Sequence, residues 1–217
     1  MDRHGASVCR EKKRFPLHFS KNRVYYIYNK RKGSHRTSGS HILSYHGKGG
    51  FPMSRLHTTL KKRGMTVTCA ESCTGGLIAK LLTDPAGASA VFRGSFVTYC
   101  NETKHALLGV KQETLSAFGA VSTETAKEMA QGALERMDAD LALSATGLAG
   151  PGSDESGKPV GSVCIGVALR GEGSVRVWAK EFCFTGTRAM IRLCAARAAL
   201  RFAQDALDAP DVFFGEK

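Results

Sequence analysis

Hydrophobic and polar positions between residues 53 and 217 follow two periods that alternate along the chain. Short runs rich in β-branched and aromatic residues predict strands, at 66–70, 95–100 and 140–146. Apolar residues at helical spacing predict helices, at about 54–63, 74–83, 102–110, 122–137 and 186–207. Strands that alternate with helices in this way are typical of a layered α/β domain.

Three local signals refine this prediction. Ser122 begins the segment "STETAKEMAQGALERM", where its hydroxyl is expected to cap free backbone N–H groups. Residues 147–161 are rich in Gly and Pro and predict a loop. The runs 162–171 and 174–184 predict a β-hairpin, so we expect a mixed sheet and not an all-parallel one.

The first 52 residues differ from the rest in composition. They carry 12 Lys and Arg against 2 Asp and Glu, a net charge of +10, whereas residues 53–217 have a net charge of +2. Apart from "VYYIY" the segment offers little apolar surface to bury, which predicts disorder. We therefore divide the chain into a basic extension (1–52), a folded domain (53–210) and a C-terminal tail (211–217).

The basic extension has three interpretations: a nucleic-acid-binding arm, an organelle-targeting segment, or a non-native addition before Met53. Its charges are not followed by an apolar run, so a secretory signal is not expected. No stretch approaches the ~20 apolar residues of a membrane span. The seven cysteines form no CxxC pair, which favours scattered, buried thiols in a reducing cytoplasm over disulfides.

The stretch "AESCTGG" (70–76) carries the most specific chemical signal in the chain. Ser72 lies at the expected turn between a strand and a helix, where unpaired N–H groups of the first helical turn stabilise negative charge. Gly75 and Gly76 are expected to let a ligand approach the backbone closely. The alternative is that Ser72 or Thr74 only caps the helix.

Further glycine-rich turns place this motif in a larger pattern. The segments "AESCTGG", "TYCNETK", "GAVS", "TGLAGP", "KPVG" and "TGTRAMIR" occur in an order and at spacings similar to those of the C-terminal domain of the CinA family. This resemblance covers about residues 55–207 and implies a three-layer α/β/α sandwich with a mixed sheet. It does not cover the basic extension, and it includes no counterpart of the larger N-terminal nucleotide-hydrolase-like domain that many CinA proteins carry.

Enzymatic members of that family are nicotinamide-nucleotide amidases, so the resemblance implies hydrolysis of nicotinamide mononucleotide to nicotinate mononucleotide and ammonia. Ser72 matches the position of the family nucleophile, and Tyr99 and Lys104 match the residues that activate it. Thr146 and Arg188 match further active-site positions. The expected substrate-binding residues are Thr74, Gly75, Gly76, Thr146, Gly147 and Arg188.

These residue types suit amide hydrolysis. His57 and His105 are the only histidines beyond the basic extension, so a Ser-His-Asp triad is poorly supplied. A lysine can act as the base where a desolvated or cationic setting lowers its pKa from ~10.4. We expect the N–H groups of Thr74–Gly76 to stabilise the oxyanion, the tyrosine hydroxyl to relay a proton or orient the serine, and Arg188 to bind phosphate.

Two other function classes stay open: a nucleotide sensor without catalysis, and a nucleic-acid-binding protein that uses the basic extension. The presence of Ser72, Tyr99 and Lys104 together favours the enzyme. Neither a metal nor a cofactor is expected, because the folded domain has no CxxC or HxxE spacing. We expect a small-molecule nucleotide as the partner, a homo-oligomer, no membrane association and a cytoplasmic location.

Overall fold

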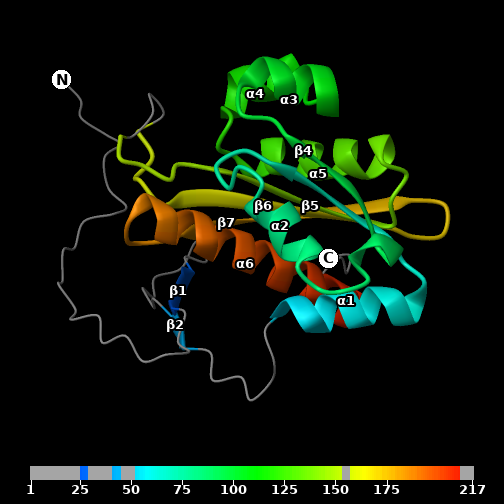
Figure 1. The fold of residues 1–217 in the computed structure, drawn as a ribbon. Helices are drawn as coiled ribbons and strands as arrows, with labels where there is room; N and C mark the ends of the chain where they lie inside the picture. Colours follow the sequence, from blue (N-terminus) through cyan, green and yellow to red (C-terminus); the bar gives the residue numbers. More distant parts are fainter. Residues whose placement is uncertain (1–24, 29–40, 45–51, 153–156, 211–217) are drawn as a thin grey trace, which may run out of the picture.

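A computed structural model describes residues 25–28, 41–44, 52–152 and 157–210 (Figure 1). Its centre is a mixed seven-stranded sheet with the order β2-β1-β7-β6-β5-β3-β4. The strands are β1 (Tyr25–Tyr28), β2 (His41–Ser44), β3 (Val67–Glu71), β4 (Phe92–Val97), β5 (Leu141–Gly147), β6 (Ser162–Arg170) and β7 (Val175–Cys183). Strands β3, β4 and β5 are parallel, whereas β6 and β7 form the predicted antiparallel hairpin beside β5.

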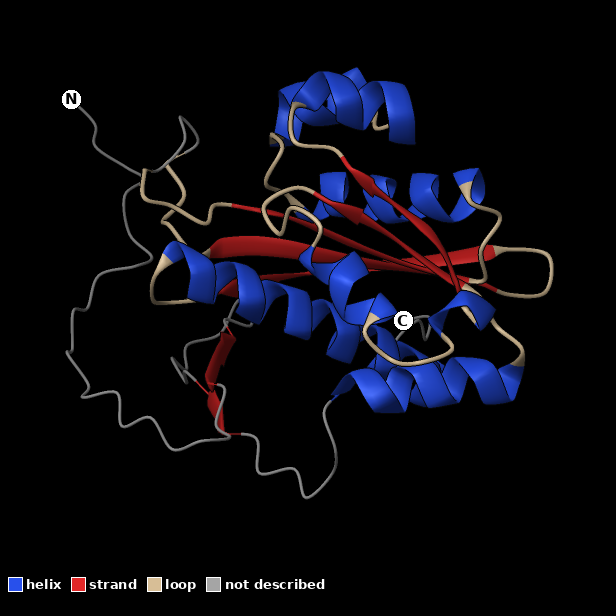
Figure 2. Ribbon diagram, in the orientation of Figure 1, coloured by secondary structure: helices blue, strands red, loops and turns tan. Residues whose placement is uncertain are grey.

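Helices cover both faces of the sheet (Figure 2). They are α1 (Pro52–Arg63), α2 (Leu77–Thr83), α3 (Asn101–Leu108), α4 (Gln112–Phe118), α5 (Thr123–Arg136) and α6 (Arg188–Asp208), with a short 3-10 turn at Ala88–Ala90. One face packs against α1, α2 and α6, and the other against α5, which carries α3 and α4 on its outer side. The predicted three-layer α/β/α fold with a mixed sheet is confirmed.

Helix α5 lies close to the sheet because the strands present small residues to it. Alanines of β3, β5 and β6 form the core beneath α5. A Cβ atom added at Gly166 would lie 2.4 Å from the carbonyl oxygen of Ala126 in α5. The hydroxyl of Ser144 donates to that same carbonyl at 2.6 Å and accepts from the Gly166 N–H at 3.1 Å. No larger side chain fits at Gly166 while α5 keeps this distance from the sheet.

The predicted element boundaries are correct where a polar cap marks them and shifted elsewhere. Ser122 caps α5 as predicted, accepting a 3.1 Å hydrogen bond from the Thr125 N–H. Helix α2 begins at Leu77, three residues later than predicted, since two positive-φ glycines precede it. Strand β4 covers 92–97 and not 95–100, and α4 was not predicted as a separate helix.

Strands β1 and β2 lie within the basic extension, at four residues each. The sequence predicts disorder there, and this prediction is wrong for these two segments, which form strands. Strand β1 pairs with β7 at Ile27 and Cys183. Apart from Pro52, which begins α1, the other residues of the basic extension and the tail 211–217 lie outside the described residues, so the domain boundaries stay predictions. None of the helices in the described part of the chain is both long and apolar enough to cross a membrane.

Candidate active site

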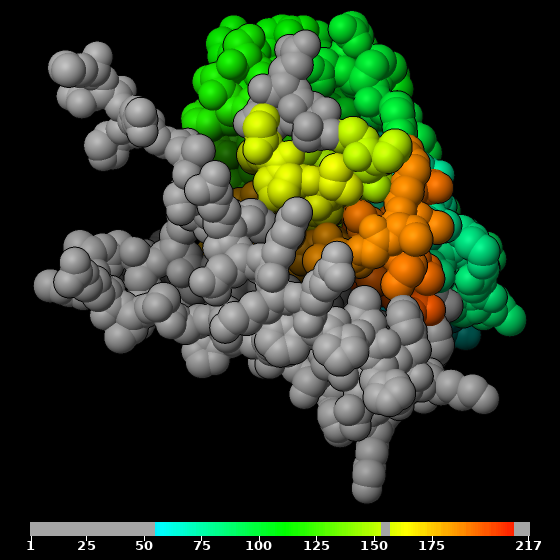
Figure 3. All heavy atoms as spheres, turned by 90° about the vertical axis from the view of Figure 1, so that its left-hand side faces the viewer, coloured from blue at the N-terminus to red at the C-terminus, as the bar shows by residue number. Residues whose placement is uncertain are grey.

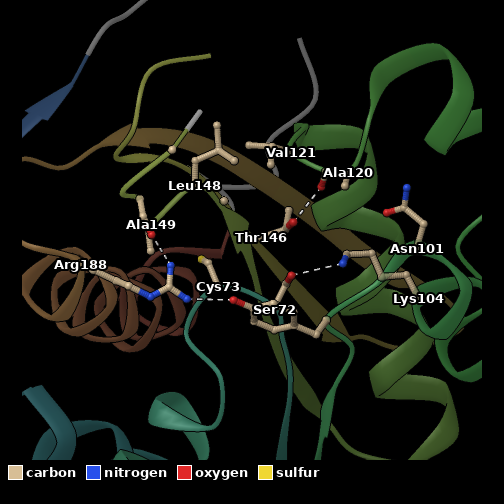
Figure 4. A pocket seen from close by; sticks show the side chains of 14 residues that line it. Ser72, Cys73, Asn101, Lys104, Ala120, Val121, Thr146, Leu148, Ala149 and Arg188 are labelled. Carbon is tan, nitrogen blue, oxygen red and sulfur yellow. Dashed lines mark hydrogen bonds between the residues drawn. The ribbon is translucent and has the colours of Figure 1, made fainter. Parts of the chain in front are cut away.

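The carboxyl ends of β3, β4 and β5 meet at one edge of the sheet, as parallel neighbours must. Strand β3 has β4 on one side and β5 on the other, an arrangement that opens a crevice beyond the strand ends. A cavity of about 260 Å³ lies there (Figure 4). Its wall is formed by Ser72, Cys73, Tyr99, Asn101, Lys104, Ala120, Val121, Thr146, Gly147, Leu148, Ala149, Gly150, Gly152 and Arg188.

Ser72 and Lys104 meet on this wall (Figure 4). The Lys104 Nζ lies 3.2 Å from the Ser72 Oγ and donates a second hydrogen bond, of 3.0 Å, to the carbonyl of Thr98. Lys104 is only 1% exposed and Ser72 is 8% exposed. The Ser72 N–H is held by the carbonyl of Ala145 in β5 at 2.9 Å, so the position of the hydroxyl follows from the sheet.

Burial lowers the pKa of the Lys104 ammonium below its usual value, and the nearby Cys100, Cys73 and Glu102 only partly oppose this. Desolvation disfavours the charged form of a lysine, so a larger fraction of Lys104 is neutral at a given pH. A neutral amine 3.2 Å from a serine hydroxyl is placed to accept its proton.

Tyr99 and Arg188 form a second pair on the wall. The Tyr99 hydroxyl accepts a 2.9 Å hydrogen bond from Arg188, whose other terminal nitrogen donates to the carbonyl of Gly150. In the described structure the Tyr99 hydroxyl is bonded to neither Ser72 nor Lys104, and the residue is 63% exposed.

Seen from the side in Figure 3, the chain after β5 (yellow) lies between the α3–α4 pair (green) and the start of α6 (orange).

Thr146 and Gly147, at the end of β5, form the floor between these two pairs. Thr146 is buried and its hydroxyl donates to the carbonyl of Ala120 at 2.7 Å (Figure 4). A Cβ at Gly147 would lie 2.5 Å from the carbonyl oxygen of Ser162, so the close approach of β6 requires glycine there. Both residues therefore lie on the wall of the cavity, and their role in substrate binding stays a prediction.

Thr74, Gly75 and Gly76 do not line the cavity. The Gly75 N–H donates to the carbonyl of Ser72 at 3.1 Å, and the Gly76 N–H donates to the Glu71 carboxylate at 3.0 Å. Both glycine N–H groups therefore have a partner within the protein in this structure, and their role in stabilising an oxyanion stays a prediction.

Comparison with known proteins identifies the family of this chain. The sequence model of the CinA C-terminal domain matches residues 52–207. The chain belongs to the CinA C-terminal domain family. It is 51% identical over 148 residues to the nicotinamide-nucleotide amidohydrolase PncC of Enterobacter agglomerans. The matched residues make up 68% of this chain and 88% of that protein.

This CinA domain is also similar to longer proteins and to solved structures. It is 51% identical over 150 residues to a CinA-like protein of Chloroherpeton thalassium, covering 69% of the chain and 36% of the relative, so the chain spans about a third of that relative's length. The competence/damage inducible protein CihA of Agrobacterium tumefaciens superposes with a TM-score of 0.67 at 46% identity, over 72% of this chain and 93% of that one. A competence damage-inducible protein A of Klebsiella pneumoniae gives 0.69 at 34% identity, over 72% and 95%.

Cys73, which follows Ser72, is also on the wall of the CinA domain cavity. The start of a helix usually lowers a thiol pKa. Here burial raises the pKa of the Cys73 thiol to about 12, and the nearby Glu71 carboxylate adds to the rise. Cys69 and Cys164 are buried too, whereas Cys183 and Cys194 are only partly buried and Cys100 is exposed, so the prediction of buried thiols is wrong at Cys100.

Several wall residues have no role predicted from the sequence: Cys73, Asn101, Ala120, Val121, Leu148, Ala149, Gly150 and Gly152. Most lie in the segments that carry the family resemblance, but apolar side chains and glycines carry no chemical signal of their own. Asn101 is the exception, because it stands three residues before Lys104 in the same helix and so on the same face.

Among the described residues no group of three or more His, Cys, Asp or Glu side chains is arranged to hold a metal ion. The two histidines of the CinA domain lie apart from the cavity wall and contact the backbone. His57 Nε2 is 3.3 Å from the Gly87 carbonyl oxygen, and His105 Nδ1 is 2.8 Å from that of Val110.

Proposed function

We propose that this CinA domain hydrolyses the carboxamide of nicotinamide mononucleotide, giving nicotinate mononucleotide and ammonia. The observation that carries the proposal is the Ser72–Lys104 pair, 3.2 Å apart at the wall of a cavity large enough to admit the pyridine ring. The 51% identity to a protein named nicotinamide-nucleotide amidohydrolase, 88% of which is covered, supports the same substrate.

In this reaction neutral Lys104 takes the proton of the Ser72 hydroxyl as the oxygen attacks the carboxamide carbon. The Lys104 ammonium then gives that proton to the departing nitrogen, which leaves as ammonia and ends the first half. A water molecule, deprotonated by the same amine, attacks the acyl-serine ester; the Ser72 oxygen leaves, takes that proton back from the Lys104 ammonium, and the nicotinate product is released. Burial supports both halves, because a lowered pKa of Lys104 makes more of the neutral amine available as a base and makes the charged form a better proton donor.

Arg188 is the residue we assign to the substrate phosphate. Its guanidinium is exposed at the first residue of α6, where the helix dipole also favours an anion. Two contacts, to the Tyr99 hydroxyl and to the Gly150 carbonyl, fix the guanidinium at the mouth of the cavity. We therefore assign Tyr99 to the orientation of Arg188, and the role that the family resemblance implies for it, activation of the serine, stays a prediction.

The test is ammonia release by the purified chain incubated with nicotinamide mononucleotide. Ser72→Ala is expected to abolish the release, since no other wall residue combines a hydroxyl with a 3.2 Å contact to Lys104. Cys73→Ala is the matched control and is expected to keep most of the activity, because a thiol with a pKa of about 12 supplies almost no thiolate. The reverse pattern would refute the serine assignment, and binding without turnover in the parent protein would favour a nucleotide sensor.

A further inference from the structure

The turn that carries Ser72 is held by a buried carboxylate, which accepts hydrogen bonds from backbone N–H groups. Glu71, the last residue of β3, is fully buried, and its two oxygens accept hydrogen bonds from the N–H groups of Gly76 (3.0 Å), Ile78 (3.0 Å) and Ala79 (2.8 Å). These N–H groups belong to the first turn of α2, which has no partner for them within the helix.

The sequence around α2 explains why the capping group comes from the strand. The N-cap residue of α2 is Gly76, which has no side chain to accept a hydrogen bond. The Glu71 carboxylate takes that place, and its negative charge faces the positive end of the helix dipole. One side chain thus joins the end of β3 to the start of α2 across Ser72, Cys73 and Thr74.

The same turn is also held by Arg192 of α6, which donates hydrogen bonds to two of its backbone carbonyls. The Arg192 Nε donates to the Cys73 carbonyl at 3.1 Å, and a terminal nitrogen donates to the Thr74 carbonyl at 2.7 Å. A Cβ at Gly75 would lie 2.9 Å from that terminal nitrogen. Gly75 therefore leaves room for the guanidinium, in addition to adopting a φ of 56° that disfavours other residues.

Neither Glu71 nor Arg192 lines the cavity, so neither is placed to touch the substrate. Both act on the backbone of the turn, the carboxylate on its N–H side and the guanidinium on its carbonyl side. We propose that Glu71 and Arg192 are positioning residues for the reaction, which together hold the 72–76 turn so that the Ser72 Oγ stays within reach of the Lys104 Nζ.

The proposal rests on the proposed function, and it makes a distinct kinetic prediction. A loosened turn moves the reacting hydroxyl but leaves Arg188 and the cavity floor in place. Loss of either residue should therefore lower kcat by ~10- to 100-fold, the effect of misplacing a reacting atom by about 1 Å, with little change in KM. A residue that only stabilises the fold would lower the melting temperature and leave the kcat of the folded fraction unchanged.

The experiment compares Arg192→Ala and Glu71→Gln with matched controls. Arg201→Ala removes another α6 arginine, one paired with Asp205, and Glu113→Gln removes another carboxylate from the first turn of a helix, α4. Ammonia release from nicotinamide mononucleotide gives kcat and KM for each variant, and thermal unfolding gives the folded fraction. Guanidinium added at millimolar concentration is expected to restore part of the kcat of Arg192→Ala, and none of that of Glu71→Gln.

A second readout does not depend on the substrate. A fluorophosphonate forms an O–P bond with an activated serine and releases fluoride, and mass spectrometry follows its attachment to Ser72. Both variants should be labelled ~10- to 100-fold more slowly than the parent, and both controls at the parental rate. A parent that labels at Ser72 but releases no ammonia would refute the proposed substrate, while the relative labelling rates would still decide the positioning roles.

Labelling of Arg192→Ala and Glu71→Gln at the parental rate would overturn the proposal, and so would a parent whose Ser72 is not labelled at all. If Arg192→Ala does not fold, Arg192→Lys takes its place. Lysine keeps the positive charge but offers a single nitrogen for the two carbonyls of Cys73 and Thr74, so labelling slower than the parental rate is expected. Parental labelling of a folded Arg192→Lys would overturn the role of the guanidinium.

Discussion

Tyr99→Phe separates two roles of the tyrosine hydroxyl, since it removes that one oxygen and leaves the ring. In the structure the hydroxyl accepts a 2.9 Å hydrogen bond from Arg188 and contacts neither Ser72 nor Lys104. We therefore expect Tyr99→Phe to weaken the orientation of Arg188, and with it substrate binding, while the chemical step keeps most of its rate.

The size of the effect follows from that single contact. A hydrogen bond of this kind contributes about 0.5–1.5 kcal/mol net, and the 63% exposure of Tyr99 places it in the lower half of that range. The corresponding rise in KM is ~2- to 5-fold, with kcat nearly unchanged. If the hydroxyl instead relayed the proton of the nucleophile, kcat would fall by ~10²–10⁴.

The assay measures initial rates of ammonia release against nicotinamide mononucleotide concentration for the parent, Tyr99→Phe, Arg188→Ala and the double variant. Because the two side chains share one contact, Tyr99→Phe should raise KM little further once Arg188 is absent. A hundredfold fall in kcat at unchanged KM would refute this reasoning and return Tyr99 to the activation of the serine.

Three further predictions follow from other contacts. Lys104→Met should lower kcat by ~10²–10⁴, since it removes the base. Because burial lowers the pKa of Lys104, kcat/KM of the parent should rise with pH through a pKa below that of free lysine, and a pH–rate profile of Lys104→Met should lack this limb. Arg188→Ala should mainly raise KM and reduce the preference for nicotinamide mononucleotide over its dephosphorylated riboside. If the variant keeps the full preference, another group binds the phosphate. Gly132→Ala should destabilise the fold by ~1–3 kcal/mol in denaturant unfolding, because its Cβ would lie 1.8 Å from the Leu108 carbonyl oxygen. Gly152→Ala should not, since a Cβ there would meet no atom of the described residues within 4 Å.

Local patterns predicted most of the order of elements in the folded domain, and they failed where a side chain of one element caps or contacts another. The start of α2 illustrates this, because its capping carboxylate belongs to Glu71 in the preceding strand. An apparent cap within "SCTGG" therefore pointed to a helix start three residues too early. Helix α4 is only seven residues long, which is too short for a hydrophobic period to separate it from its neighbour.

The candidate site could be predicted only in part, for the same reason. Ser72 and Lys104 are 32 residues apart, and parallel pairing of β3 with β4 brings the ends of their strands together. The family resemblance supplied that pair, but no local pattern indicates that Arg192, 119 residues beyond Cys73, holds the turn. Gly75 is predicted to let a ligand approach the backbone, whereas the group that lies close to it in the structure is the Arg192 guanidinium.

The uneven exposure of the cysteines has a consequence for inhibitor studies. Cys73 is adjacent to the candidate nucleophile but is buried, with a pKa of about 12, so alkylating reagents will react with it slowly. Cys100 is the exposed cysteine of the described chain, and it stands between Tyr99 and Asn101, which both line the cavity. An adduct on Cys100 would obstruct the entrance of the cavity to substrate. Iodoacetamide would then inactivate the protein as it inactivates a thiol enzyme, although the reacting group is a hydroxyl. Repeating the alkylation on Cys100→Ser distinguishes obstruction of the entrance from chemical modification of the nucleophile.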